Sequence, residues 1–525
     1  MHIDKLKFKQ VKHFTESNKS DTIVKFRAPS NNDCRAFGCK QKSITLRLVR
    51  IRPKERKKLY EVFKMKKILF LLLFLVIFLA FPISNLIGLN GENKPIAIKS
   101  TATSSNFSEV SMILQNKCVD CHTPGMTRKP IYAELPIAKQ LMARDISAAS
   151  ERLILDKKIY SGEQLFSPLM LARLEQVIIN NKMPPALYLS MHWTDSLKIS
   201  EKETILKWIK SEWANQSWSK ESAANFKGEP VQPLPFSAGL NPEKVALGDK
   251  LYHDTLLSGD NTLSCASCHS LKKGGTDQLP VATGIKGQQG PINSPTVYNA
   301  MYNLAQFWDG RARDLQSQAE GPVANPGEMG AHWDEVVNKL KKVAEYQDSF
   351  KKLYPSEGIT KTTVTQAIAV FEESLLTPNS RFDQYLRGNQ DVLTAKEKEG
   401  YQLFKQSCSS CHFGPVLGGQ SFEKMGVQQN YFSLRGEDLT QADNGRFNVT
   451  KKESDRHYFK VPVLRNIEVT YPYFHDGSVK SLSEAVRIMG LVQRGKKFND
   501  EEIDKIVSFL KTLTGEYQGV SLTEK

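Results

Sequence analysis

Histidine and cysteine are scarce in this chain, which has 10 His and 8 Cys among 525 residues. Six of the cysteines fall in three short motifs, so only Cys34 and Cys39 remain, and a disulfide framework is not indicated. The chain also lacks a basic surface beyond its N-terminus. Residues 1–67 hold 20 Lys and Arg against 6 Asp and Glu, and the other residues contribute only +2 to the formal net charge of +16. The body of the protein therefore gives no reason to expect a nucleic-acid partner.

The scarce residues are concentrated in three copies of Cys-x-x-Cys-His. Two thiols at this spacing can form thioether links to the vinyl groups of a haem, and the adjacent histidine supplies the proximal iron ligand. A zinc site would need four ligands close together, whereas these copies lie more than a hundred residues apart. We therefore expect three covalently bound haem c groups, held by Cys118, Cys121, His122, Cys265, Cys268, His269, Cys408, Cys411 and His412.

A long apolar run, Ile68 to Ile83, follows the basic N-terminus. With residues 84–89 it reaches the length of about 20 residues that spans a bilayer, and the positive charges before it keep the N-terminus in the cytoplasm. An uncleaved anchor and a cleaved signal peptide are both open interpretations, and the lack of a clear small-x-small cleavage site favours the anchor. Either one exports the haem domains to the periplasmic side of a bacterial inner membrane. Residues 1–64 show no pattern of buried faces and are expected to be disordered, or to precede the true start at Met65.

Helical patterns surround the motifs. Gly248, Leu251 and Tyr252 precede Cys265 in the same Gly-x-x-Leu-aromatic pattern that Gly400, Leu403 and Phe404 form before Cys408, which indicates two related haem domains in tandem. Capping patterns predict helix starts at Thr394-x-x-Glu397, Asn499-x-x-Glu502 and Ser200-x-x-Glu203. A stretch rich in Pro and Gly, residues 227–235, has the composition of a semi-rigid linker between domains.

The fold class expected is mainly α, with tandem cytochrome c-like haem domains behind a single N-terminal transmembrane helix. The expected segments, in chain order, are a basic segment 1–64, an anchor or signal 65–90, an N-terminal c-type haem domain 91–226, a linker 227–240, a second haem domain 241–390 and a third haem domain 391–525.

An ordered series of motifs runs from about Leu247 to Gly515: Ser264–His269, Asn293-Ser-Pro-Thr296, Gln306-Phe-Trp-Asp-Gly-Arg311, Gln318-Ala-Glu-Gly-Pro322, Asn325-Pro-Gly-Glu-Met329, Val461–Asn466 and Tyr473-Phe-His-Asp-Gly477. On these motifs the sequence resembles the bacterial di-haem cytochrome c peroxidases, which implies that 241–390 is a peroxidatic haem domain and 391–525 an electron-transfer haem domain. The region from Cys118 to Trp208 resembles, more weakly, a haem-binding domain that is fused ahead of some of these enzymes.

The resemblance implies which residues carry the chemistry. Peroxide would be cleaved at the haem on His269, where Glu328 matches the distal acid-base glutamate and Gln318 its neighbouring glutamine. A carboxylate suits this task because it can take a proton from one peroxide oxygen and return it to the other. Trp308 matches the tryptophan that lies between the two haems and helps electrons cross.

The resemblance also implies metal ligands. Met489, fourteen residues after His475, matches the methionine that completes the iron of the high-potential haem on His412. The side chain of Asn293 and the carbonyls of Thr470 and Pro472 match the oxygen ligands of a calcium ion between the haem domains.

Two features of the iron sites depart from the family pattern or stay open. Many family members carry a blocking histidine in the Gly-rich loop after the first haem of the pair, but here Ile285 occupies that position, which puts reductive activation in doubt. The sixth ligand of the N-terminal haem is open between Met183 and His192, with Met191 as a weaker third candidate.

The function expected is a peroxidase that reduces hydrogen peroxide to water with electrons relayed through three haems. The donor is a quinol or a small cytochrome c, the membrane is contacted through the N-terminal helix, and a homodimer is an open possibility. Two alternative functions remain open. A multihaem electron-transfer cytochrome would have no use for Gln318 and Glu328, and a protein-modifying di-haem enzyme of the methylamine dehydrogenase maturation type would have tyrosine where this chain has Met489.

Overall fold

The computed structural model describes residues 53–86, 107–123, 134–189, 192, 195–216 and 220–524. The chain divides into two compact units between Leu89 and Asn90. In the first unit, helix α2 spans Pro53–Leu86, so it begins inside the segment 1–64 for which no regular structure was expected. Throughout the described ranges, none of the helices is both long and apolar enough to cross a membrane. The remainder of the predicted basic segment and of the predicted anchor, residues 1–52 and 87–90, lies outside the described residues.

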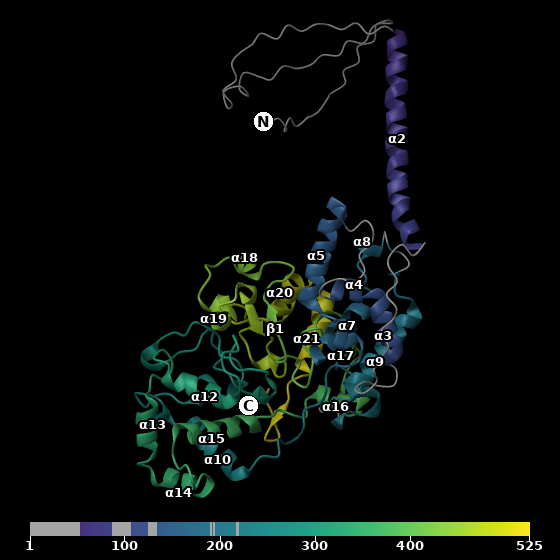
Figure 1. The fold of residues 1–525 in the computed structure, drawn as a ribbon. Coiled ribbons are helices and arrows are strands. Elements are labelled where there is room, and N and C mark those ends of the chain that lie inside the picture. The colour runs from purple at the N-terminus through teal and green to yellow at the C-terminus, as the bar shows by residue number, and fades with distance from the viewer. Residues whose placement is uncertain are drawn as a thin grey trace, which may run out of the picture. The chain divides into compact units, whose positions relative to one another are not determined.

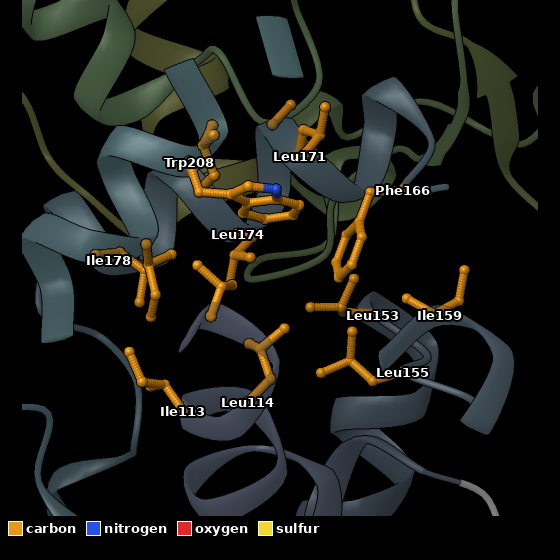
Figure 2. Close-up of a cluster of buried hydrophobic side chains, with 14 of the residues drawn as sticks. Ile113, Leu114, Leu153, Leu155, Ile159, Phe166, Leu171, Leu174, Ile178 and Trp208 are labelled. Atoms are coloured by element: carbon orange, nitrogen blue, oxygen red, sulfur yellow. The ribbon is translucent and has the colours of Figure 1, made fainter. Parts of the chain in front are cut away.

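The second unit is mainly helical and begins with the region around Cys118 (Figure 1). Its described helices are α3 (Phe107–Lys117), α4 (Val119–His122), α5 (Pro136–Arg152), α6 (Lys157–Tyr160), α7 (Pro168–Ile179), α8 (Ala186–Leu189) and α9 (Ile199–Ala214). Their apolar faces meet in one core. Figure 2 shows the indole of Trp208 and the ring of Phe166 among leucine and isoleucine side chains, and these two rings pack edge to face with centroids 4.9 Å apart.

The region around Cys265 has a second core, which its helices enclose. These helices are α10 (Pro242–His253), α11 (Cys265–Cys268), α12 (Leu315–Ala324), α13 (Trp333–Leu340), α14 (Ala344–Leu353) and α15 (Lys361–Ser374).

The region around Cys408 has a third core. Its helices are α16 (Arg381–Leu386), α17 (Ala395–Ser407), α18 (Tyr431–Arg435), α19 (Phe447–Thr450), α20 (Leu482–Arg494) and α21 (Asp500–Lys511). Strands β1 (Phe422–Lys424) and β2 (Tyr458–Lys460) pair antiparallel with Phe422 opposite Lys460, and β3 (Glu516–Tyr517) pairs antiparallel with β4 (Val520–Ser521).

The sequence repeat before the second and third motifs has a packing reason. Helix α10 lies against α15, and α17 lies against α21 (Figure 1). A Cβ atom at Gly248 would clash with the carbonyl oxygen of Ala367, and one at Gly400 would clash with that of Lys505. Only glycine allows these backbones to approach so closely, and the repeat therefore marks the same helix crossing in two haem domains.

The helix starts were predicted with mixed success. The capping boxes at Thr394 and Asn499 are confirmed, since each side chain accepts a hydrogen bond from the backbone N–H three residues later. The predicted box at Ser200 is wrong. Helix α9 begins at Ile199, because the carboxylate of Glu201 accepts a hydrogen bond of 2.7 Å from the backbone N–H of Lys198 and so extends the helix upstream.

The segment that was expected to be a linker is packed into the third region. Val231, Gln232 and Leu234 are fully buried, and Val231 belongs to the third core. The guanidinium of Arg465 donates a hydrogen bond of 3.0 Å to the carbonyl of Gln232. A composition rich in Pro and Gly therefore marks an irregular backbone here, but that backbone is held by buried contacts.

Candidate active site

Each Cys-x-x-Cys-His motif folds as a single helical turn. The backbone N–H groups of His122, His269 and His412 donate to the carbonyls of the cysteines four residues earlier, at 3.1, 3.0 and 3.0 Å. The turn brings both thiols and the imidazole of each motif to one locality, as attachment of a single haem requires. All six cysteines are free thiols, which leaves them available for thioether links.

Two of the three proximal histidines are oriented by a backbone carbonyl. His122 Nδ1 lies 2.7 Å from the carbonyl oxygen of Leu153, and His412 Nδ1 lies 2.9 Å from that of Leu417. When Nδ1 donates to these carbonyls, the proton is held on Nδ1, and Nε2 is left as the metal ligand. Burial lowers the pKa of His122 and His269 and lowers that of His412 to about 4, so the imidazoles are neutral, as ligation needs. These residues fit a c-type haem.

The third motif opens onto a cavity of about 280 Å³. His412, Cys408 and Cys411 line it together with Met489, which the sequence had placed as the partner ligand. Met489 lies in the same apolar cluster as Trp308 and Phe459. The structure thus brings the predicted proximal and distal ligands to one cavity, although they are far apart in the chain.

Trp308 lines the same cavity and is held from both sides. Its indole N–H donates a hydrogen bond of 3.0 Å to the carbonyl of Asn293, and its own carbonyl accepts one of 2.8 Å from the backbone of Lys460. Its ring meets that of His475 edge to face, with centroids 6.4 Å apart. Such contacts fix the indole in one orientation beside the haem cavity.

His475 is part of a buried charged cluster that sequence reasoning did not identify. Its Nε2 lies 2.7 Å from Asp443 Oδ1, and Arg435 bonds both Asp443 and Asp476. Burial raises the pKa of Asp443, but the hydrogen bonds from His475 and Arg435 hold this pKa well below its usual range. The imidazole and the two carboxylates are close enough to hold a metal ion, but the guanidinium of Arg435 already pairs with both acids, which disfavours a cation.

Glu328 lies in a tight loop after α12. Its carboxylate accepts a hydrogen bond of 2.7 Å from Asn325. Burial raises the pKa of Glu328, while the positive charge of Arg311 and the bond from Asn325 oppose the rise. Burial raises the pKa of the Cys268 thiol to about 11, and the charges of Asp277 and Glu328 raise it further, so Glu328 is near enough for its charge to act on the second haem attachment site.

A second loop supports Glu328 from its backbone. The N–H of Ile285, in a short 3-10 turn at Ile285–Gly287, donates a hydrogen bond of 2.8 Å to the carbonyl of Glu328. A Cβ atom at Gly284 would clash with the carbonyl of Gly327, and one at Gly330 would clash with the side chain of Ile285. The buried Ile285 therefore packs on the glutamate loop and anchors it.

Gln318 is on α12, half-buried, and within the described residues no hydrogen bond joins it to Glu328. Arg311 is a residue that sequence reasoning missed as part of this site, although it ends the motif Gln306–Arg311. Its guanidinium lies 3.5 Å from the centroid of the Phe307 ring and pairs with Asp309 at 3.1 Å. Its positive charge lowers the pKa of Glu328, an effect that its place in the motif does not indicate.

The predicted calcium ligands lie along one cavity. Asn293, Thr470 and Pro472 all line the haem cavity. The amide nitrogen of Asn293 donates a hydrogen bond of 2.9 Å to the carbonyl of Leu279, so the amide oxygen is the atom left to face a cation. Oxygen atoms of this kind are the ligands that calcium prefers.

The sixth ligand of the N-terminal haem stays open. Met183 is half-buried just after α7. His192 stacks on Tyr188 with ring centroids 4.1 Å apart, and its Nδ1 lies 3.0 Å from the Tyr188 carbonyl. Met191 lies outside the described residues. Both described candidates carry donor atoms suitable for haem iron.

Comparisons with known proteins agree with this arrangement. Residues 242–391 match the family described as di-haem cytochrome c peroxidase, residues 79–211 match a haem-binding domain, and residues 397–514 match cytochrome c. Cytochrome c peroxidase Ccp of Escherichia coli strain K12 is 42% identical over 439 residues, which are 82% of this chain and 92% of that protein.

Two further relatives cover the C-terminal part. Cytochrome c551 peroxidase of Nitrosomonas europaea is 48% identical over 289 residues, which are 55% of this chain and 85% of that protein. Methylamine utilization protein MauG of Methylorubrum extorquens is 34% identical over 316 residues, which are 57% of this chain and 86% of that protein.

Proposed function

We propose a function for this chain, which belongs to the di-haem cytochrome c peroxidase family. It is a peroxidase that reduces hydrogen peroxide to water with electrons relayed through c-type haems. Each turnover consumes one peroxide, two electrons and two protons and yields two waters. When bound, the haems supply the iron that receives peroxide and the redox couples that carry electrons.

The observation that carries the assignment of roles is the environment of Glu328. We propose that its carboxylate takes the proton from the peroxide oxygen nearer the iron and delivers it to the leaving oxygen. A raised pKa suits both halves of this transfer, because it makes the carboxylate a better base and keeps its acid form populated closer to neutral pH. Asn325 orients the carboxylate, and Arg311 keeps enough of it ionised. Gln318 is proposed as a neighbouring polar group of the same site.

Three covalently bound haems are proposed, one in each of the domains 91–226, 241–390 and 391–525. Support comes from the three helical motif turns, the three cores and the three family matches. Electrons are proposed to pass from the haem on His122 to that on His412, and then beside Trp308 to that on His269. Met489 is proposed as the second ligand at His412, since both residues line one cavity.

One calcium ion is proposed between the haem domains, bound by Asn293 and by the carbonyls of Thr470 and Pro472. Its support is that all three residues line the cavity that Trp308 also lines. The ion would tie the loop before Trp308 to the segment that leads to His475.

The first alternative, a cytochrome that only transfers electrons, leaves Glu328 and its supporting Ile285 loop without a purpose. The second alternative, a protein-modifying enzyme, is addressed by the residue at position 489. We propose that methionine there keeps the His412 haem as an electron store.

The haem domains are proposed to lie on the periplasmic side of a bacterial inner membrane, with the apolar run from Ile68 as the attachment and a quinol or a small cytochrome c as donor. The experiment that tests the function measures peroxide consumption by membranes that contain the protein. Reduced quinol and reduced cytochrome c are supplied separately, and membranes without the protein serve as the control. If neither donor supports peroxide consumption above that of the control membranes, the peroxidase assignment is rejected.

A further inference from the structure

The residue that follows the third proximal histidine is buried in the domain of the first haem. Phe413 is fully buried and belongs to the core whose other members, from Phe107 to Trp213, come from the N-terminal haem region. Its ring lies 6.1 Å from that of the fully buried Trp213, centroid to centroid. Cys118, which the first haem uses for attachment, packs against the same core.

Polar contacts hold the two domains together around this aromatic pair. Arg173 on α7 pairs with Glu423 on β1 at 2.5 Å, and both side chains are largely buried. The amide of Asn180, at the end of α7, donates a hydrogen bond of 2.7 Å to the carbonyl of Gln406 on α17. Arg152 of the N-terminal region also reaches the cavity that His412 lines. The first haem domain is therefore docked on the third by a packed interface.

Trp213 is oriented within this interface. Its indole N–H donates a hydrogen bond of 2.9 Å to the buried carboxyl of Glu175 on α7. A tryptophan with its N–H satisfied and its ring packed against an aromatic neighbour keeps one orientation. Packed side chains also couple two redox centres better than a gap does, because electron tunnelling weakens more steeply across empty space.

We infer that Trp213 and Phe413 are the contact through which electrons cross from the first haem to the haem on His412. The inference rests on the proposed electron route and names the residues that carry it. In each crossing one electron leaves the reduced first haem and arrives at the oxidised third haem, and no bond or proton is transferred. The external donor replaces that electron, and peroxide finally accepts it.

Pulse radiolysis of the full-length oxidised protein tests this without peroxide. The pulse reduces a fraction of the haems, and electrons then redistribute from the first haem to the His412 haem. The time course of this redistribution is measured from the visible absorption bands of the two haems. In Trp213→Leu and Phe413→Leu we expect loss of the fast redistribution phase, with the equilibrium potentials of both haems unchanged. Trp208→Leu is the matched control, because Trp208 lies in the same core but contacts Phe107 and Phe166.

The outcomes separate the inference from the function on which it rests. A fast phase that survives in both Trp213→Leu and Phe413→Leu overturns the inference, and so does equal slowing in Trp208→Leu, which would indicate general loosening of the core. If Trp213→Leu does not fold, Phe413→Leu decides alone, with its potentials as the check on the haem. Absence of peroxide reduction in the unaltered protein would reject the peroxidase assignment and leave the redistribution result standing.

Discussion

Replacement of Glu328 by glutamine removes the proposed proton carrier but keeps its shape and its capacity to bond Asn325. General acid-base transfer contributes roughly 10²–10⁴-fold to a rate, which corresponds to about 2.7 to 5.4 kcal/mol of activation free energy. We therefore expect Glu328→Gln to bind all its haems and to lose peroxide turnover by that factor. Glu320→Gln is the matched control, since Glu320 is on α12 and pairs with Lys361.

The pH profile gives a second readout of the same group. The carboxylate must be ionised to accept the first proton, so activity should fall as the pH drops through the pKa of Glu328. Because burial raises that pKa, the acid limb should lie above the ordinary glutamate value of about 4.3. Arg311→Leu removes a charge that lowers this pKa and should move the acid limb to still higher pH. Arg313→Leu should leave it in place, because the exposed Arg313 pairs with Asp314.

The measurement is steady-state peroxide reduction across the pH range for the unaltered protein and the four variants, with haem content determined by absorbance. Turnover of Glu328→Gln within a factor of about three of the unaltered protein, far less than the loss expected of an acid-base group, would remove Glu328 from the mechanism. An acid limb that does not respond to Arg311→Leu would show that another group controls the profile.

Three further predictions follow from other residues. Met489→Leu should lower the reduction potential of the His412 haem, because a thioether ligand raises that potential. Redox titration measures this, with Met425→Leu as the control because Met425 also lines the cavity. A larger drop in potential for Met425→Leu than for Met489→Leu would show that the ligand assignment is wrong. Arg465→Met should destabilise the third domain by about 3–5 kcal/mol, because it leaves the carboxylate of Asp383 buried without its partner. Both side chains are fully buried, with Arg465 Nη2 2.7 Å from Asp383 Oδ1. A denaturant midpoint equal to that of the unaltered protein would contradict this. The oxidised protein should react with peroxide on first mixing, since Ile285 cannot ligate iron, whereas Ile285→His should show a lag in the Soret change until the protein is reduced.

Some of the candidate site follows from local sequence alone. Cys-x-x-Cys-His specifies both haem attachment and the proximal ligand within five residues, and the capping boxes at Thr394 and Asn499 depend only on neighbours along the chain. The family resemblance, which the comparisons confirm, rests on ordered motifs of the same short range. Local patterns could not place the start of α9, because Glu201 competes with Ser200 for the capping role, nor reveal that residues 231–234 are buried.

The sequence by itself determined that this chain is a mainly helical c-type haem protein of the di-haem peroxidase family, because covalent spacing and helical periodicity are written along the chain. Tertiary structure decided which distant groups act on one another. It set the charge of Arg311 near Glu328, joined His475 to Asp443, and buried Phe413 in the core of another domain. The interactions of these groups depend on distances and burial through space, which no pattern of neighbouring residues specifies.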